Sequence, residues 1–276
     1  MSARSSTTTG ELGRRALLAL ALAAAALLCA VGCSKPEPAS DQVLEVRVAA
    51  AADLSKAFGE ISEAYEQKTG KKVKATLGST GLLSKQIVEG APFDVFFAAN
   101  VSFVDKVLSQ GACEAETKAL YARGRIVLWS KGIDKPKTLA DLKDGRFRKI
   151  AIANPEHAPY GKAAEEALRG SGLWEEIKPK LAFGENVQQT LQFAQTGNAD
   201  AAIVALSLAI TSDGDYTLLD ESLHQPLDQA LVVCGKGARG DAGRDFAQFV
   251  SGPEGRAIMK KYGFLLPGET LSIAEK

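Results

Sequence analysis

The sequence predicts an α/β protein that forms two lobes around mostly parallel sheets. Short apolar runs alternate with longer segments whose apolar residues recur at helical spacing, and this alternation is typical of strands joined by helical crossovers. Near the C-terminal end the alternation stops, because the last strand is followed by two consecutive helices. We therefore expect the chain to leave the first lobe, build the second and return to the first.

The first part of the chain shows the alternation clearly. Its predicted strands are VLEVRVAAAA, KVKATL, DVFFAA and RIVLWS. The helix after the first strand places four apolar residues on one face: Leu54, Phe58, Ile61 and Tyr65. Gly70 has the position of its C-terminal cap. The turn GSTG opens the next helix, and VSFVDKVLSQG forms a further helix that stops at its glycine.

The second part repeats the pattern before it closes with helices. Its strands are KIAIAN, KLAFG, AAIVAL and QALVVCGKG, and its helices start near Lys162, at Val187 and near 241 and 253. The predicted crossings lie near residues 126 and 232. Lobe I then comprises residues 44–125 plus 233–276, and lobe II comprises residues 126–232.

The N-terminal segment has the features of an export signal. Arg14 and Arg15 precede a short apolar run that ends in small residues and a cysteine, AVGC. This ending resembles the lipobox of bacterial lipoproteins, which implies a signal peptide at residues 1–32 and a lipid anchor on Cys33. The alternative is an uncleaved membrane anchor, and both place the remainder outside the cytoplasm. Residues 33–43 read as an extended, proline-containing tether.

Composition and motifs argue against several functions. The chain has 33 basic and 33 acidic residues and no basic block, which disfavours nucleic acid as a partner. It contains only two histidines and none of the common metal, nucleophile or phosphate-loop motifs. His157 lies between prolines and reads as a solvent-facing loop residue. We therefore expect neither an enzyme nor a cofactor or bound metal cation.

Two further cysteines, Cys113 and Cys234, follow the predicted lipidation site at Cys33. An exported protein encounters oxidising conditions, so the two residues could form a disulfide. Two buried free thiols are the alternative, and the sequence leaves both open.

Four strand-to-helix turns suggest a binding site for a small anion. They are AADLS at 51–55, GSTGL at 78–82, APYGK at 158–162 and GENVQ at 184–188. In an α/β sheet such turns lie at the carboxyl ends of strands, where ligands bind. The unpaired N–H groups and the dipole of a helix N-terminus favour negative charge, and Ser79 and Thr80 add neutral hydroxyl donors. The alternative is that Asp53, Ser79, Thr80 and Asn186 are ordinary N-caps.

Several segments carry a resemblance to a known family. AAADLSKAFGEISEAYEQKTGKKV, GSTGLLSKQIVEGAPFDVFFAAN, NPEHAPYGKAAEEAL, GENVQQTLQFAQTGNADAAIVAL and KKYGFLLP resemble the periplasmic molybdate-binding proteins of ABC importers, which are bacterial extracellular solute-binding proteins. The resemblance implies a two-lobed periplasmic-binding fold of type II with two crossover strands. It also implies a monomer that closes on molybdate or tungstate and delivers it to an ABC permease and its ATPase subunit. The alternatives are another oxyanion, such as phosphate or sulfate, or an oxyanion sensor that transports nothing.

The family's ligand positions fall on six residues of this chain: Asp53, Ser79, Thr80, Tyr160, Val187 and Ala205. Tyr160 and Val187 would donate backbone N–H groups. Ala205 stands where many members carry a tyrosine, so that donor is absent, and Tyr160, Ser207 or water could replace it. Asp53 is unexpected beside a dianion. Either it turns away to cap its own helix, or it accepts a proton from a partly protonated oxyanion such as hydrogen phosphate.

Overall fold

The computed structural model describes residues 45–132 and 135–269. The predicted signal peptide, Cys33 and the tether up to residue 43 lie outside the described residues. In the described part of the chain, none of the helices has the length and apolar character needed to cross a membrane.

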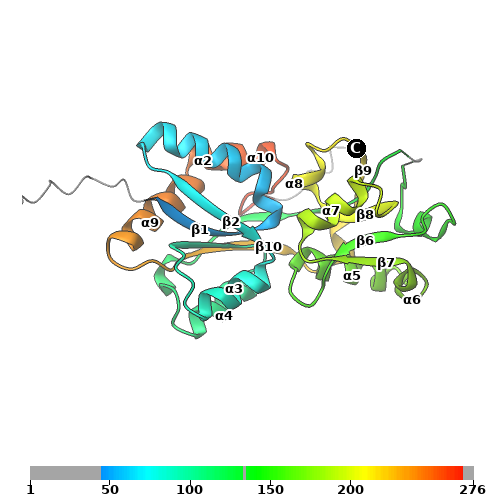
Figure 1. The fold of residues 1–276 in the computed structure, drawn as a ribbon, viewed down its shortest axis with the longest axis horizontal. Coiled ribbons are helices and arrows are strands. Elements are labelled where there is room, and N and C mark those ends of the chain that lie inside the picture. The colour runs from blue at the N-terminus through cyan, green and yellow to red at the C-terminus, as the bar shows by residue number, and fades with distance from the viewer. Residues whose placement is uncertain (1–44, 133–134, 270–276) are drawn as a thin grey trace, which may run out of the picture. The chain divides into compact units, whose positions relative to one another are not determined.

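The first sheet contains five strands in the order β2-β1-β3-β10-β4 (Figure 1). β1 pairs in parallel with β2 and β3, whereas β10 runs antiparallel to both β3 and β4. β10 is therefore the one strand of this sheet with the opposite direction. The strands are β1 (Val46–Ala51), β2 (Val73–Gly78), β3 (Val95–Ala98), β4 (Ala119–Gly124) and β10 (Leu227–Val233).

The second sheet has five strands in the order β7-β6-β8-β5-β9. β6 is parallel to β7 and β8, and β5 runs antiparallel to β8 and β9. β5 is therefore the strand of opposite direction in this sheet, as β10 is in the first. The strands are β5 (Ile126–Ser130), β6 (Ile150–Ala153), β7 (Leu181–Gly184), β8 (Ala201–Ala205) and β9 (Asp215–Leu218).

The chain passes twice between the sheets, once from β4 to β5 and once from β9 to β10. In both cases the strand that follows the passage becomes the reversed strand of its new sheet. This arrangement confirms the predicted α/β class, the mostly parallel sheets and the type II topology with two crossover strands. All of β10 pairs in the first sheet, so the chain has already returned there by residue 227.

Helices cover both faces of the first sheet (Figure 1). Alternate residues of β1 enter different cores, because side chains alternate across a strand. Val48 and Ala50 pack with α2, α9 and α10, and Ala49 packs with α3 and α4. The helices are α2 (Ser55–Thr69), α3 (Thr80–Val88), α4 (Val101–Ser109), α9 (Ala238–Ser251) and α10 (Pro253–Lys261). Gly70 ends α2 in the left-handed conformation, as predicted, with φ 71°.

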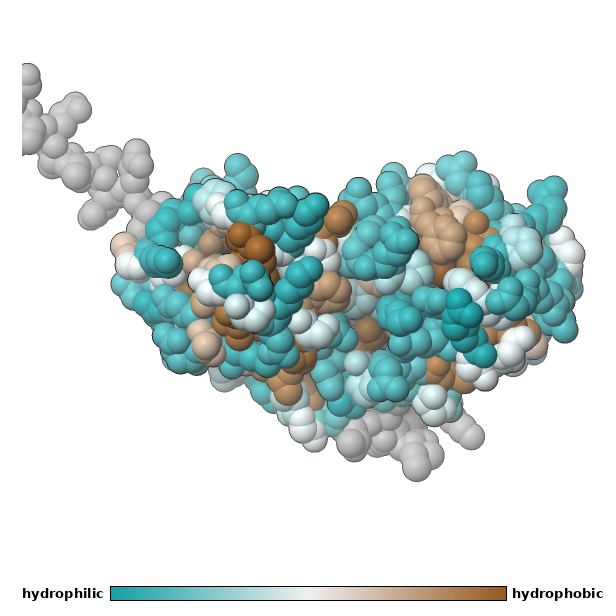
Figure 2. All heavy atoms as spheres, turned by 90° about the horizontal axis from the view of Figure 1, so that it is seen from below, coloured by the Kyte–Doolittle hydropathy of each residue, from teal (hydrophilic) through white to brown (hydrophobic). Residues whose placement is uncertain are grey.

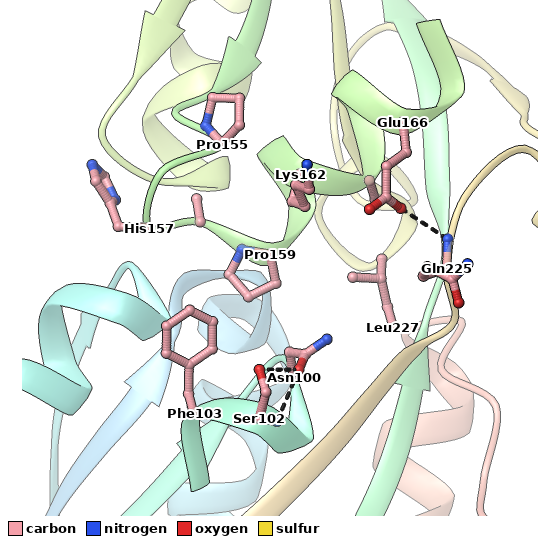
Figure 3. A pocket seen from close by; sticks show the side chains of 12 residues that line it. Asn100, Ser102, Phe103, Pro155, His157, Pro159, Lys162, Glu166, Gln225 and Leu227 are labelled. Carbon is pink, nitrogen blue, oxygen red and sulfur yellow. Dashed lines mark hydrogen bonds between the residues drawn. The ribbon is translucent and has the colours of Figure 1, made fainter. Parts of the chain in front are cut away.

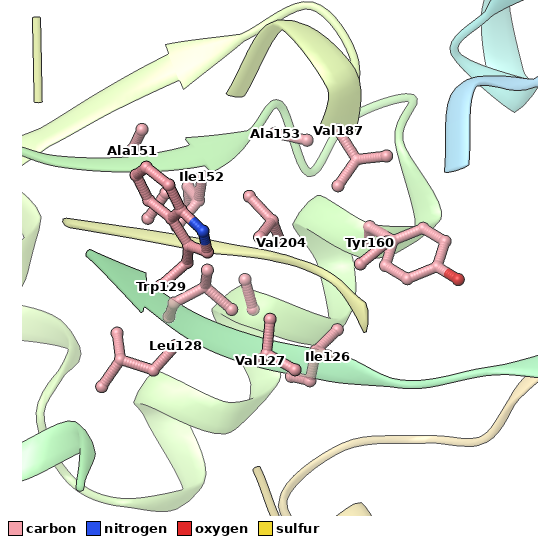
Figure 4. Close-up of a cluster of buried hydrophobic side chains, with 14 of the residues drawn as sticks. Ile126, Val127, Leu128, Trp129, Ala151, Ile152, Ala153, Tyr160, Val187 and Val204 are labelled. Carbon is pink, nitrogen blue, oxygen red and sulfur yellow. The ribbon is translucent and has the colours of Figure 1, made fainter. Parts of the chain in front are cut away.

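The core of the second sheet is a separate apolar cluster that includes Trp129, Ile152 and Val204 (Figure 4). Tyr160 lies at the margin of this cluster, and its hydroxyl points away from Trp129. The surrounding helices are α5 (Pro159–Gly170), α6 (Trp174–Ile177), α7 (Val187–Gln195) and α8 (Leu206–Ala209). α5 begins before Lys162, the predicted start, because Pro159 is well suited to a first helical turn.

Short 3-10 segments complete the connections: η1 (Ala52–Leu54), η2 (Ala115–Thr117), η3 (Leu139–Lys143), η4 (Lys178–Lys180) and η5 (Glu221–Leu223). The surface face in Figure 2 is mainly polar, with apolar residues interspersed. A disulfide joins Cys113, which follows α4, to Cys234, which follows β10. Of the two cysteine states that the sequence left open, the structure therefore contains the disulfide.

Candidate anion-binding site

The four predicted turns meet in one small pocket. It is lined by residues at or after the ends of β1, β2 and β3 in the first sheet and of β6 and β7 in the second: Ala51, Ala52, Asp53, Gly78, Ser79, Thr80, Ala99, Ala158, Pro159, Tyr160, Asn186 and Val187. Two separate sheets therefore contribute their carboxyl ends to the same place, the position at which α/β proteins bind ligands.

Three helix N-termini contribute lining residues to this pocket. α3 begins at Thr80, α5 at Pro159 and α7 at Val187. The N–H groups in a first helical turn have no intrahelical partner, and the helix dipole makes that end positive. Asp53 is the one charged side chain among the described lining residues. The pocket therefore offers mainly neutral donors to a ligand.

The two hydroxyls of the GSTG turn are not helix caps. Ser79 Oγ donates to the carbonyl oxygen of His157 at 2.6 Å and lies 2.8 Å from its Nδ1. Thr80 Oγ1 accepts from the backbone N–H of Ala99 at 3.2 Å, which leaves its own hydrogen available to a ligand. Asn186 does cap its helix, because its Oδ1 accepts from the N–H groups of two α7 residues. The cap interpretation therefore holds for Asn186 alone among the four candidates.

His157 is not the solvent-facing loop residue that the sequence predicts. It is partly buried, and its carbonyl oxygen also accepts from the N–H of Gly81 at 2.9 Å. The loop before α5 is therefore held against the start of α3. No group of three or more potential metal ligands occurs in the part of the chain that the structure describes.

Asp53 is fully buried and does not cap a helix. Its Oδ2 accepts hydrogen bonds from Tyr160 Oη at 2.9 Å and from Gln229 Nε2 at 2.7 Å, whereas its Oδ1 has no partner. Burial raises the pKa of Asp53 from 3.8 to about 6, although hydrogen bonds from Gln229 and Tyr160 and, to a smaller extent, the backbone of Asp53 and Leu54 offset part of this increase. The predicted role as a cap is therefore wrong, and Asp53 is part of the pocket.

Two residues of this network were not predicted. Gln229 lies in β10 and Tyr121 in β4, and Tyr121 Oη donates to Gln229 Oε1 at 2.7 Å. Burial raises the pKa of both Tyr121 and Tyr160 well above the usual value, and the nearby Asp53 raises it further. Both hydroxyls therefore stay protonated. The available signal in the sequence was a glutamine directly before the apolar run ALVV of β10.

Ala205 does not line the pocket. It is buried at the end of β8, where it precedes α8. Ser207, a candidate replacement for the missing tyrosine hydroxyl, donates instead to the carbonyl oxygen of Asp53 at 2.8 Å. The structure thus brings together five of the six predicted ligand positions and leaves Ala205 outside.

The pocket holds little free space in this arrangement, ≈ 10 Å³, which is about the space of one water molecule. A larger pocket of ≈ 250 Å³ shares Ala158 and Pro159 with it. Figure 3 shows this second pocket between Phe103 of α4 and Lys162 of α5. A ligand larger than water must therefore separate the turns before it enters.

The fold and the pocket define an α/β binding protein that encloses a small solute between two sheets. Residues 46–265 match the family model described as bacterial extracellular solute-binding protein, and the chain belongs to this family. It is a solute-binding protein and not an enzyme.

Named relatives make this placement more specific. The chain is 36% identical to the molybdate-binding protein ModA of Azotobacter vinelandii, over 90% of this chain and 96% of that one. It is 33% identical to ModA of Rhodobacter capsulatus, over 88% and 95%. The solved structure of the Azotobacter vinelandii periplasmic molybdate-binding protein aligns with a TM-score of 0.76 at 29% identity, covering 81% of this chain and 100% of that one.

Proposed function

We propose that the chain is the substrate-binding component of an ABC importer and that it captures molybdate or tungstate. The observation that carries this proposal is the meeting of neutral donors from two sheets in one pocket. The similarity to molybdate-binding proteins over about nine-tenths of the chain supports the choice of ligand. No chemical reaction is required of the site.

In this proposal the ligand is held from both sides. Thr80 donates its free hydroxyl hydrogen from the end of β2, whereas Ser79 can donate to the ligand only when its hydroxyl turns away from the His157 carbonyl oxygen. The backbone N–H groups of Tyr160 and Val187 donate from the starts of α5 and α7. A ligand that leaves one such donor unpaired loses on the order of 1–3 kcal/mol. The bound oxyanion therefore stabilises the arrangement in which the two sheets approach each other, and each sheet with its helices acts as one lobe.

The protein works outside the cytoplasm in this proposal. The export signal at residues 1–32 and lipidation of Cys33 would tether a monomer to the membrane, beside the permease and the ATPase subunit that import the ligand. A Bacillus subtilis relative with 29% identity over 87% of this chain is named a putative ABC transporter substrate-binding lipoprotein, which supports a lipid anchor.

A second candidate ligand is hydrogen phosphate, and one observation favours it. Asp53 places a carboxyl group with an unpaired oxygen in the pocket. An ionised carboxylate repels a dianion but can accept a hydrogen bond from an oxyanion that carries a proton.

The backbone donor of Val187 offers a sharp test. Val187 is the first residue of α7, where proline is tolerated although it lacks an N–H, and Asn186 has the extended conformation that a residue before proline needs. Calorimetric titration with molybdate, tungstate, sulfate and phosphate should show the tightest binding for molybdate or tungstate. Val187→Pro should weaken that binding at least tenfold, whereas Val187→Ala, which keeps the N–H, should weaken it far less.

Equal affinities of the Val187→Pro and Val187→Ala variants would contradict the proposed donor. If none of the four oxyanions binds to the purified protein, the proposed function is wrong.

A further inference from the structure

Asp53 has bonding capacity that the described residues do not use. Its side chain is 0% exposed and is the one carboxylate among the described residues that line the pocket. Oδ2 accepts from Tyr160 and Gln229, and Oδ1 has no hydrogen bond. A buried oxygen without a partner is costly, so this atom indicates a ligand contact.

The charge of Asp53 also has no cationic partner among the described residues. The titratable groups that face it are the hydroxyls of Tyr160 on α5 and Tyr121 on β4, both neutral donors. Gln229 on β10 donates a neutral hydrogen bond to the carboxylate, and Ser207 on α8 donates to the backbone carbonyl oxygen of Asp53. α7 and α8 carry no charged residue, and Lys56 on α2 is exposed. Asp53 thus forms no ion pair with any described residue.

An oxyanion in the same pocket would meet this carboxylate at short range. Two negative charges in a buried site strongly disfavour each other, and the usual result is that one of them binds a proton. A proton on Oδ1 would remove the repulsion and would convert the unpaired acceptor into a donor. Tyr160 and Gln229 could keep their hydrogen bonds to Oδ2.

We propose that Asp53 is a specificity-determining residue that takes up one proton when the oxyanion binds and then donates a hydrogen bond to it from Oδ1. The proton comes from solvent, and the O–H bond of the carboxylic acid is the only covalent bond formed. This inference rests on the proposed capture of an oxyanion. It applies to ligands without a proton, such as molybdate, because hydrogen phosphate can bring its own.

The pKa of Asp53, which burial raises to about 6, sets the pH range of the effect. Above that pH the free protein is ionised at Asp53, and binding must take a proton from solvent. By linkage, the dissociation constant for molybdate then increases about tenfold for each pH unit. Hydrogen phosphate should show a smaller increase, so the protein would lose its preference for molybdate as pH rises.

Calorimetry of the purified protein with sodium molybdate tests this directly. Titration at pH 8 in two buffers of different ionisation enthalpy measures the protons taken up, and we expect a value near one per molybdate. The dissociation constant should increase about tenfold from pH 7 to pH 8. In Asp53→Asn, whose side chain is always neutral, both effects should disappear. Asp213→Asn, at an exposed ion pair with Lys131, should retain them.

The outcomes separate this inference from the function on which it rests. Tight molybdate binding without proton uptake, and with the same affinity at pH 7 and pH 8, overturns the inference and leaves the proposed function intact. Proton uptake that persists in Asp53→Asn also overturns it, because another group must then titrate. If neither molybdate nor tungstate binds at any pH, both fail. The measurement on the unaltered protein stands even if Asp53→Asn does not fold.

Discussion

The hydroxyl of Tyr160 donates a hydrogen bond to Asp53 Oδ2 over 2.9 Å. This bond joins the start of α5, beside the second sheet, to η1 at the end of β1 in the first sheet. Gln229 reaches both groups, with Nε2 at 2.7 Å from Asp53 Oδ2 and 3.1 Å from Tyr160 Oη. Because Gln229 lies in β10, the strand that follows the second passage between the sheets, the network connects the pocket to the crossover region.

Removal of the Tyr160 hydroxyl should weaken ligand binding. In Tyr160→Phe the approach of the two sheets no longer gains a hydrogen bond to a buried carboxyl group, which is worth about 1.5–3 kcal/mol. We expect the dissociation constant for molybdate to increase about tenfold or more. Titration calorimetry measures the change, and Tyr262→Phe is the matched control because Tyr262 donates to Glu60 over 3.0 Å at the surface. Similar losses in both variants would argue against the connecting role.

Gly81 should be required for the closed arrangement. A Cβ at this position would lie 2.6 Å from the carbonyl oxygen of His157 and 2.9 Å from its Cα, so Gly81→Ala should keep the loop before α5 away from α3. We expect at least a tenfold loss of molybdate affinity in calorimetry. Gly59→Ala is the control, since its Cβ would meet nothing within 4 Å on α2. It should leave affinity unchanged and stabilise the fold by about 0.5–1 kcal/mol.

The sequence predicts the alternation of strands and helices because each element has a strong local pattern. Val48 and Ala50 lie in the apolar run VAAAA, and Leu54, Phe58 and Ile61 repeat at helical spacing. β4 and β9 were not predicted. β4 carries Arg123 and no β-branched residue, and β9 begins with Asp215 and has no fully buried residue. Both strands are therefore specified mainly by their pairing partners.

The site could be predicted only in part for a related reason. Turn residues such as Ser79 and Val187 are recognisable because strand ends and helix starts have local signals. The partners of Asp53 are separated from it by 107 residues for Tyr160 and by 176 for Gln229. Contacts between residues so far apart in the sequence depend on how the two sheets meet. The sequence identified Asp53 as unusual, but it could not reveal which groups surround it.

The disulfide should contribute to stability without affecting the ligand. Cys234 lies beside Asp94 at the start of β3, with its N–H 2.8 Å from the Asp94 carbonyl oxygen, whereas the pocket lies at the carboxyl ends of strands. Replacement of Cys113 and Cys234 by serine should lower the free energy of unfolding by about 2–4 kcal/mol, measured with urea. Molybdate affinity should stay within about twofold. The unaltered protein with reductant should behave like the double variant, and a large loss of affinity would contradict this separation.

The buried carboxyl group of Asp53 should make stability depend on pH in a defined direction. Its pKa is raised from 3.8 to about 6 in the folded protein, so the favourable contribution of the neutral group is complete below pH 3.8 and is lost as the pH rises through 6. At pH 8 the free energy of unfolding should therefore be lower by on the order of 3 kcal/mol than if Asp53 stayed neutral. Asp53→Asn should escape it, because an amide stays neutral while its oxygen can still accept from Tyr160 and Gln229. Urea unfolding of both proteins at pH 4.5 and pH 8 isolates the effect, since all other titrating groups are shared. From pH 4.5 to pH 8, the free energy of unfolding of the variant should increase by about 2–3 kcal/mol relative to that of the unaltered protein. If the difference in unfolding free energy between the two proteins is the same at both pH values, Asp53 does not carry the unpaired charge inferred from its surroundings.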